Sequence, residues 1–145
     1  MPKLLRAVRL DDSDEQVFRA CGAAADGEWV TTAGFAVSDD GFSADSFMAI
    51  ASRARCTIAE VVEVSDADLE AQVETFAWQL VKAWNAPSWE AAQALAGEEV
   101  RHAAEVCETL EPEVWITVKR SRRDDGALEE QYSVYDRLLI GAHPA

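Results

Sequence analysis

Residues able to do chemistry gather in the stretch GEEVRHAAEVCE, which runs from Gly97 to Glu108. It contains carboxylates, an imidazole and a thiol, which are groups that bind metals or transfer protons. Within it, Glu99 and His102 form the motif E-x-x-H. In carboxylate-bridged di-iron bundles the two side chains of this motif leave one face of a helix and share a metal. The stretch is therefore a metal cluster, a redox centre or the side of an ordinary helix.

The sequence does not supply the rest of a metal site. A di-iron bundle needs a second E-x-x-H motif and two more glutamates, and the other histidine of the chain, His143, belongs to the C-terminal tail. On a helical wheel Cys107 lies about 20° from the centre of the apolar face, whereas His102 lies about 120° from that centre. Along the helix axis, His102 and Cys107 are about 7 Å apart. We therefore expect no metal, no cofactor and a core position for Cys107.

Glu99 and His102 remain a candidate binding pair. Glu99 lies about 60° from the centre of the apolar face, at its border. A carboxylate there must be hydrogen-bonded, paired or partly exposed, so a cleft beside the pair is one interpretation. Glu98, Arg101 and Glu105 have the spacings of solvent-exposed ion pairs within one helix.

Trp78 is the other candidate binding residue. It projects about 140° from the centre of the apolar stripe of its helix, between Glu74 and Lys82. Exposed apolar surface of this size is usually covered. Trp78 therefore either packs on another element of the same chain or lies in a subunit or partner interface, where tryptophan is enriched.

Other chemical motifs are absent or incomplete. DDSDE and DDGFSAD lack the order of calcium ligands that an EF-hand loop requires. The chain has no G-x-S-x-G, no phosphate-binding glycine loop and no dinucleotide fingerprint, so a serine or cysteine hydrolase is not expected. KRSRR, at 119–123, is the one basic cluster; it is interpreted as a solvated hairpin end that can also dock an acidic partner.

Composition indicates an ordinary folded domain with an acidic surface. The 145 residues are 49% hydrophobic and 28% charged, with 27 acidic and 13 basic residues and a formal net charge of −14. Such a surface repels phosphate backbones and anionic membranes. There is no secretory signal and no apolar run long enough to span a bilayer, so we expect a cytoplasmic protein whose three widely spaced cysteines are reduced.

The hydrophobic periods predict the elements that must position these residues. Period-two patterns predict strands over 3–10, 29–37 and 56–64, the last being the most central, and a hairpin of two strands around Asp125-Gly126. A helix capped at Ser13 should end near Cys21, and a short helix or ordered loop should follow residue 40. Ser65 and Ser88 should cap two long consecutive helices, separated by Asn85 in a left-handed conformation.

This order predicts a single α+β domain over residues 1–145. The sheet should be antiparallel or mixed, with about five strands, and the two long helices should pack on one of its faces. The segments GEWVTTAGFAV, CTIAEVVEVSDADLEAQVE, NAPSWEAA and GEEVRHAAEVC, among others, resemble a family of short acidic bacterial proteins that carry a domain of unknown function. The resemblance implies a compact bacterial cytoplasmic protein and brings no catalytic residue.

The sequence thus favours a non-enzymatic interaction or accessory module that binds a protein partner or forms a homodimer. The observations behind this hypothesis are the missing catalytic constellation, the net charge of −14 and the outward Trp78. The alternative is a small-molecule-binding protein or enzyme with a cleft near Glu99 and His102.

Overall fold

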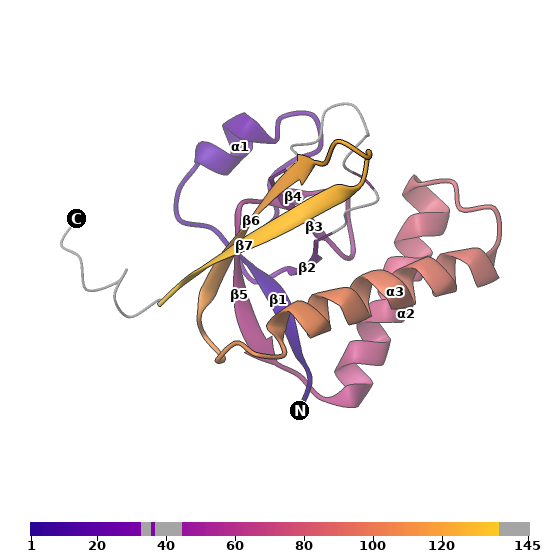
Figure 1. Ribbon diagram of the computed structural model, residues 1–145. Helices are drawn as coiled ribbons and strands as arrows, with labels where there is room; N and C mark the ends of the chain where they lie inside the picture. Colours follow the sequence, from indigo (N-terminus) through magenta and orange to yellow (C-terminus); the bar gives the residue numbers. More distant parts are fainter. Residues whose placement is uncertain (33–35, 37–44, 137–145) are drawn as a thin grey trace.

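The computed structural model describes residues 1–32, 36 and 45–136, which form an α+β fold. Its elements are, in chain order, β1 (Lys3–Val8), α1 (Ser13–Val17), β2 (Trp29–Thr31), β3 (Phe47–Ala49), β4 (Arg55–Cys56), β5 (Ile58–Glu63), α2 (Asp66–Ala83), α3 (Trp89–Cys107), β6 (Trp115–Arg122) and β7 (Leu128–Tyr135). Figure 1 shows the curled sheet beside the paired helices α2 and α3, with α1 at the opposite upper edge.

The sheet is antiparallel and has seven strands in the order β4-β3-β2-β1-β5-β6-β7. The expected number, about five, was too low because β3 and β4 form where a short helix or loop was predicted. Phe47, Met48 and Ala49 are all completely buried, so this strand lacks the alternation of a half-buried one and its period cannot be recognised. The centre of the sheet is β1, whereas the sequence favoured the strand that became β5.

Local signals predicted the two long helices correctly. The Ser65 hydroxyl accepts a hydrogen bond from the Asp68 backbone N–H at 3.0 Å, and the Asp68 carboxylate accepts one from the Ser65 N–H at 3.3 Å. Ser88 caps α3 in a similar way, and Asn85 between the helices has a φ of 53°. The predicted cap at Ser13 was wrong, because α1 begins there without a side-chain cap and ends at Val17.

The core lies between the sheet and the helices. α3 packs on β1 and β2, and α2 packs on α3. Figure 1 shows the connection between α2 and α3 at the end of the helix pair that projects beyond the sheet. Phe76 and Leu80 of α2, and Val100 and Ala103 of α3, are among the fully buried residues. None of the described helices is long and apolar enough to cross a membrane.

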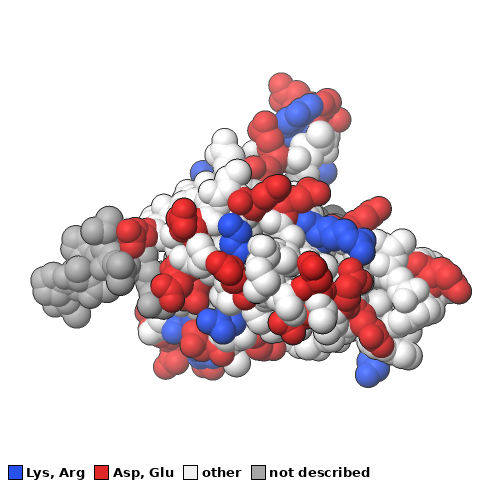
Figure 2. All heavy atoms as spheres, turned by 90° about the horizontal axis from the view of Figure 1, so that it is seen from below, with Lys and Arg blue, Asp and Glu red and all other residues white. Residues whose placement is uncertain are grey.

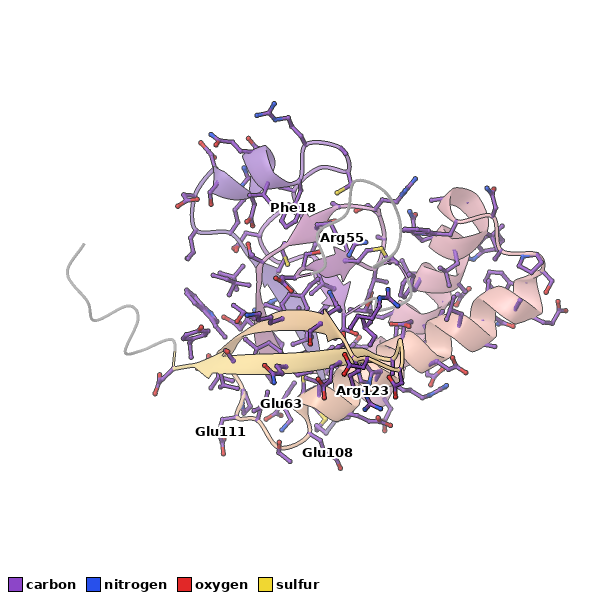
Figure 3. The ribbon with its side chains drawn as sticks, turned by 45° about the horizontal axis from the view of Figure 1, so that its top comes forward. Phe18, Arg55, Glu63, Glu108, Glu111 and Arg123 are labelled. Carbon is purple, nitrogen blue, oxygen red and sulfur yellow. The ribbon has the colours of Figure 1, made fainter. Side chains whose placement is uncertain are left out.

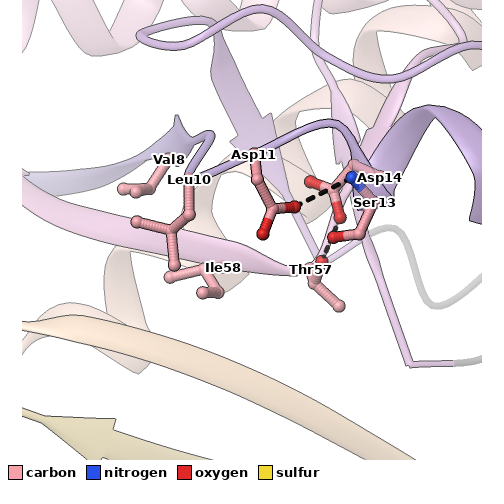
Figure 4. A pocket seen from close by; sticks show the side chains of 7 residues that line it. All are labelled: Val8, Leu10, Asp11, Ser13, Asp14, Thr57 and Ile58. Atoms are coloured by element: carbon pink, nitrogen blue, oxygen red, sulfur yellow. Dashed lines mark hydrogen bonds between the residues drawn. The ribbon is translucent and has the colours of Figure 1, made fainter. Parts of the chain in front are cut away.

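The segment that contains α1 is fastened to the start of β5. The Thr57 hydroxyl donates to Asp14 Oδ1 at 2.5 Å, and the Ser13 N–H donates to Asp11 Oδ1 at 2.8 Å. Figure 4 shows both bonds at the edge of a cavity of about 70 Å³. This volume is close to that of a few water molecules, so the cavity is too small for a larger ligand.

The predicted hairpin forms as β6 and β7, and Gly126 in its turn has a φ of 87°. Two of the labelled residues in Figure 3, Phe18 and Arg55, lie on the α1 side of the molecule, whereas Glu108 lies at the opposite edge. The predicted strand over 29–37 is shown as far as Thr31. Its residues 33–35 and 37 lie outside the described part of the chain, as does His143.

Candidate functional site

The stretch from Gly97 to Glu108 lies almost entirely on α3, and its residues divide as the helical wheel predicted. Cys107 is fully buried, and burial raises the pKa of its thiol to about 12. It is therefore a core residue and a poor nucleophile. Glu98, Arg101 and Glu105 are exposed. Arg101 pairs with Glu70 of α2, with Nη2 to Oε1 at 3.5 Å.

Glu99 and His102 are both half-buried on the side of α3 that faces β7. His102 Nε2 lies 3.3 Å from Glu130 Oε1. The structure therefore brings the predicted pair together with a third group from a distant strand. Glu130 is the charged residue that interrupts the apolar face of that strand in the sequence.

Arg120 holds this glutamate in place from β6. Its side chain is completely buried, and its Nε donates to Glu130 Oε2 at 2.7 Å. Nη1 donates to the Ser46 carbonyl at 2.9 Å, and Nη2 donates to the Thr32 carbonyl. The Arg120 backbone N–H also donates to Asp45 Oδ1 at 2.8 Å. The guanidinium of Arg120, on β6, thus connects this strand to β7, to Thr32 and to Ser46.

Ser46 is shared by two buried arginines. Its carbonyl accepts from Arg120, and its hydroxyl accepts from Arg55 Nη1 at 3.4 Å. Arg55 and Ser46 are both completely buried. Buried charge requires such hydrogen bonds, because an unsatisfied guanidinium in the interior is strongly destabilising.

The cluster shifts the ionisation of its members in opposite directions. Burial disfavours the charged form of Glu130, but hydrogen bonds with His102 and Arg120 outweigh it and lower the pKa of Glu130 to about 2. The hydrogen bond to Glu130 raises the pKa of His102, and burial raises the pKa of Glu99. Glu130 is therefore a permanent anion at neutral pH, whereas His102 can exchange a proton.

Tyr132 and Thr32 extend the buried polar region beside Arg120. Burial raises the pKa of the Tyr132 phenol, so it stays neutral. Its hydroxyl lies beside the Glu130 carboxylate and the Thr32 hydroxyl. The arrangement fixes the orientation of His102 and joins α3 to β7. In the described part of the chain no group of three or more histidine, cysteine, aspartate or glutamate residues could hold a metal ion.

The interpretation of KRSRR as a solvated hairpin end was wrong for one residue. Lys119, Arg122 and Arg123 are exposed, whereas Arg120 is buried. The signal for this was available, because Ile116, Val118 and Arg120 continue one period of two. A charged residue in the apolar phase of a strand indicates a buried partner, and the partner here is Glu130, directly opposite on β7.

Trp78 lies away from this cluster, on the part of the helix pair nearer its connection. It is 49% exposed, and its ring lies 4.6 Å from the ring of Trp89, centroid to centroid, at an interplanar angle of 44°. Of the two alternatives, packing on another element of the same chain is seen in part, since Trp78 contacts α3 through Trp89; a role in an interface stays a prediction.

Residues 1–138 match the family of unknown function DUF6505, and the chain belongs to this family. Comparison with curated proteins and with solved structures gave no match. The family carries no established activity, so a function must be argued from the geometry.

Proposed function

We propose that the protein is a non-enzymatic protein-interaction module of the bacterial cytoplasm. Its two long helices, packed together on one face of the sheet, present their connected end to a protein partner. The observation that carries this proposal is the exposed Trp78, whose ring packs against the partly buried Trp89. Tryptophan is the residue most enriched at the energetic centres of interfaces, where it is desolvated on binding.

The same end of the helix pair contains a hollow next to apolar side chains. A cavity of about 300 Å³ is lined mainly by apolar residues of the helix ends and their connection: Leu80, Trp84, Asn85, Ala86, Pro87, Ala91, Ala92 and Leu95. A hollow of this size accepts one large apolar side chain of a partner. An exposed tryptophan and an apolar hollow within one short region are the anchors that a small interface needs.

Charge indicates what kind of partner fits. Glu74 and Glu90 are exposed beside Trp78 and Trp89 in the sequence, and the whole chain carries −14. Figure 2 shows acidic side chains spread over the face seen from below, with fewer basic ones between them. The partner we propose therefore presents an apolar anchor flanked by basic residues, since opposite charge speeds association and excludes wrong partners.

The test compares Trp78→Ala with Val134→Ala, a matched control that removes another apolar side chain of 49% exposure from β7. Loss of the aromatic pair should cost less than about 1.5 kcal/mol of stability. Trp78→Ala should abolish both partner capture and any self-association seen by sedimentation velocity, whereas Val134→Ala should leave them unchanged. A strictly monomeric protein whose captured partners are the same with and without Trp78 would contradict the proposal.

A charge test separates a basic partner from a homodimer. Glu74→Lys should weaken binding of a basic partner. A homodimer through the same surface would bring the acidic residues of two copies together, so the same substitution would strengthen self-association at low salt. Sedimentation velocity and affinity capture at two salt concentrations distinguish the two results.

The alternative is a small-molecule site or enzyme beside Glu99 and His102. The raised pKa of Glu99 and the bond between His102 and Glu130 favour it, because perturbed ionisable groups gather at functional sites. However, neither residue lines the cavities of about 70, 380, 320 and 300 Å³ in the described part of the chain. This alternative would be supported by a small molecule that shifts NMR signals of the wild-type protein but shifts none in a double variant with Glu99→Gln and His102→Gln.

A further inference from the structure

Five side chains form a continuous row across five strands of the sheet. Trp29 of β2 lies directly opposite Arg6 of β1, Arg6 opposite Glu60 of β5, Glu60 opposite Trp115 of β6, and Trp115 opposite Tyr135 of β7. Residues directly opposite each other in antiparallel strands project from the same face. The row therefore places an ion pair between aromatic rings on one surface.

This surface is the one that faces away from α3. Glu130 reaches His102 of α3, and Tyr135 is an odd number of residues from Glu130 on the same strand. Successive side chains of a strand alternate between the two faces, so Tyr135 and the rest of the row project from the other face. Arg6 and Tyr135 are 42% and 44% exposed, and the row is open to a ligand.

The centre of the row is held rigidly. Arg6 Nη2 donates to Glu60 Oε1 at 3.1 Å, and the indole Nε1 of Trp115 donates to Glu60 Oε2 at 3.3 Å. The Arg6 guanidinium carbon also lies 5.9 Å from the centre of the Trp29 ring. Glu60 is nearly buried and serves as the support that orients a guanidinium and an indole, as binding sites require.

A cavity of about 380 Å³ opens on this row. It is lined by Arg6, Ala7, Val8, Asp26, Gly27, Glu60 and Trp115. Small-molecule sites begin at about 300 Å³, so the volume suits a compact ligand. The Asp26-Gly27 backbone is bound to β1, since the Gly27 N–H donates to the Ala7 carbonyl at 2.8 Å. The part of the cavity wall formed by Asp26 and Gly27 is therefore fixed to β1.

The cavity offers one donor group and one acceptor group that the fold leaves available. A guanidinium has five N–H donors, and Arg6 bonds to Glu60 through one of its nitrogens. Asp26 accepts the Arg9 N–H with Oδ1 at 2.9 Å, and its Oδ2 has no hydrogen bond to the described residues. Arg6 and Asp26 carry opposite charges, so a ligand that bridges them needs no net charge.

We propose that this cavity binds a small, neutral, planar nitrogen heterocycle whose edge presents a hydrogen-bond acceptor next to an N–H donor, as the cyclic amide edge of a purine does. The acceptor meets Arg6, the N–H meets Asp26, and the ring lies against Trp115. An anionic ligand would be repelled by Asp26, Glu60 and the acidic surface, and a ligand without an acceptor would leave the remaining Arg6 donors unmatched. This site is distinct from the surface around Trp78 and does not depend on it.

The test uses hypoxanthine as the probe and follows the indole N–H signal of Trp115, assigned with Trp115→Phe, by NMR. Hypoxanthine should shift this signal saturably. Caffeine, which is planar but has no N–H, and benzoate, which is planar and anionic, should bind at least about tenfold more weakly, the effect of one unmade hydrogen bond to a charged group. Equal shifts with hypoxanthine and caffeine, or no saturable shift, would overturn the proposal.

Asp26→Asn gives the sharpest variant. It keeps the shape of the exposed side chain and an oxygen for the Arg9 N–H, but it turns the available acceptor into a donor. Binding of hypoxanthine should fall about tenfold or more, while the melting temperature stays unchanged. Arg53→Gln is the matched control, because Arg53 lies 4.6 Å from the Trp84 ring in another part of the molecule. Equal loss in both variants would contradict the assignment.

A purine can come free or as a base of single-stranded nucleic acid, and a further measurement distinguishes the sources. The net charge of −14 opposes a polyanion. An excess of a purine oligonucleotide should therefore not reduce the binding of hypoxanthine. Tighter binding of the oligonucleotide than of the free base would overturn the assignment of a small neutral ligand.

Discussion

Two arginine–glutamate pairs span neighbouring strands of the sheet, one on each face, and they differ in what surrounds them. Arg120 and Glu130 lie directly opposite on β6 and β7, beneath α3, and Arg6 and Glu60 lie directly opposite on β1 and β5, on the other face. The Arg120 side chain is completely buried, whereas that of Arg6 is 42% exposed.

The difference shows how burial assigns a role to the same chemical pair. The buried guanidinium uses its donors on Glu130 and on two backbone carbonyls, so it joins separate segments of the chain. The exposed guanidinium makes one bond to its glutamate and leaves donors facing a cavity. We interpret the first pair as structural and the second as a binding pair.

The largest expected difference between the two pairs is the loss of stability when the arginine of each pair is replaced by leucine. Arg120→Leu leaves Glu130 without its main partner and should cost on the order of 3 to 5 kcal/mol of the free energy of unfolding. Arg6→Leu should cost about 1 kcal/mol, because solvent screens a half-exposed pair. Urea unfolding at pH 7 measures both.

A double variant tests the cause of the larger loss. Arg120→Leu combined with Glu130→Leu removes the unpaired charge, so it should be more stable than Arg120→Leu alone. Equal losses for Arg120→Leu and Arg6→Leu would show that the two faces do not differ in the way described.

The second-largest expected effect is the loss of stability of the buried pair in acid, where Glu130 becomes protonated. The pKa of Glu130 is lowered to about 2, so its ionised form stabilises the fold above the ordinary carboxyl range near pH 4.5. This contribution is lost as the pH falls from 4.5 toward 2, and it is worth on the order of 2 to 3 kcal/mol. Glu130→Gln should flatten this part of the stability curve. Glu129→Gln, an exposed neighbour on the same strand, should retain the dependence, and its loss there would count against Glu130 as the source.

The smallest expected effect is the change in stability near neutral pH that the titration of His102 causes. The bond with Glu130 raises the pKa of His102, so its contribution is fully present below the ordinary value near pH 6.5 and disappears as the pH rises through the raised value. Because His102 is 44% exposed, solvent screening limits this to about 0.5 kcal/mol. His102→Gln should remove the dependence that begins above pH 6.5.

Glu99 must be separated from this measurement. Its raised pKa has the same sign, since protonated Glu99 also favours the fold at lower pH. Unfolding curves of His102→Gln in wild-type and Glu99→Gln backgrounds separate the two contributions. A pH dependence unchanged by His102→Gln in both backgrounds would show that His102 does not titrate with folding.

The helices were predictable because their signals are local. The Ser65 cap, the Ser88 cap and the left-handed Asn85 each depend on residues within one turn. The strands β3 and β4 were missed because a strand buried on both faces shows no period. The split of the α3 stretch was also predictable, since helix geometry alone places Cys107 in the core and Glu98 in solvent.

The candidate site was predicted in part. Glu99 and His102 were recognised from their spacing, and Glu130 stood out as a charge that interrupts an apolar phase. Their partners could not be identified, because Arg6 and Glu60 are 54 residues apart, and Arg120 lies 74 residues from Ser46. No local period contains this information.

The sequence by itself therefore determined the acidic charge, the paired helices, the β6–β7 hairpin and the position of Cys107. Side chains three or four residues apart on a helix, or across a short turn, meet whatever the rest of the chain does. Only the tertiary structure decided which glutamate each arginine binds and which pair is buried. Strand order and register bring distant residues together, and the packing of α3 on one face leaves the row from Trp29 to Tyr135 on the other.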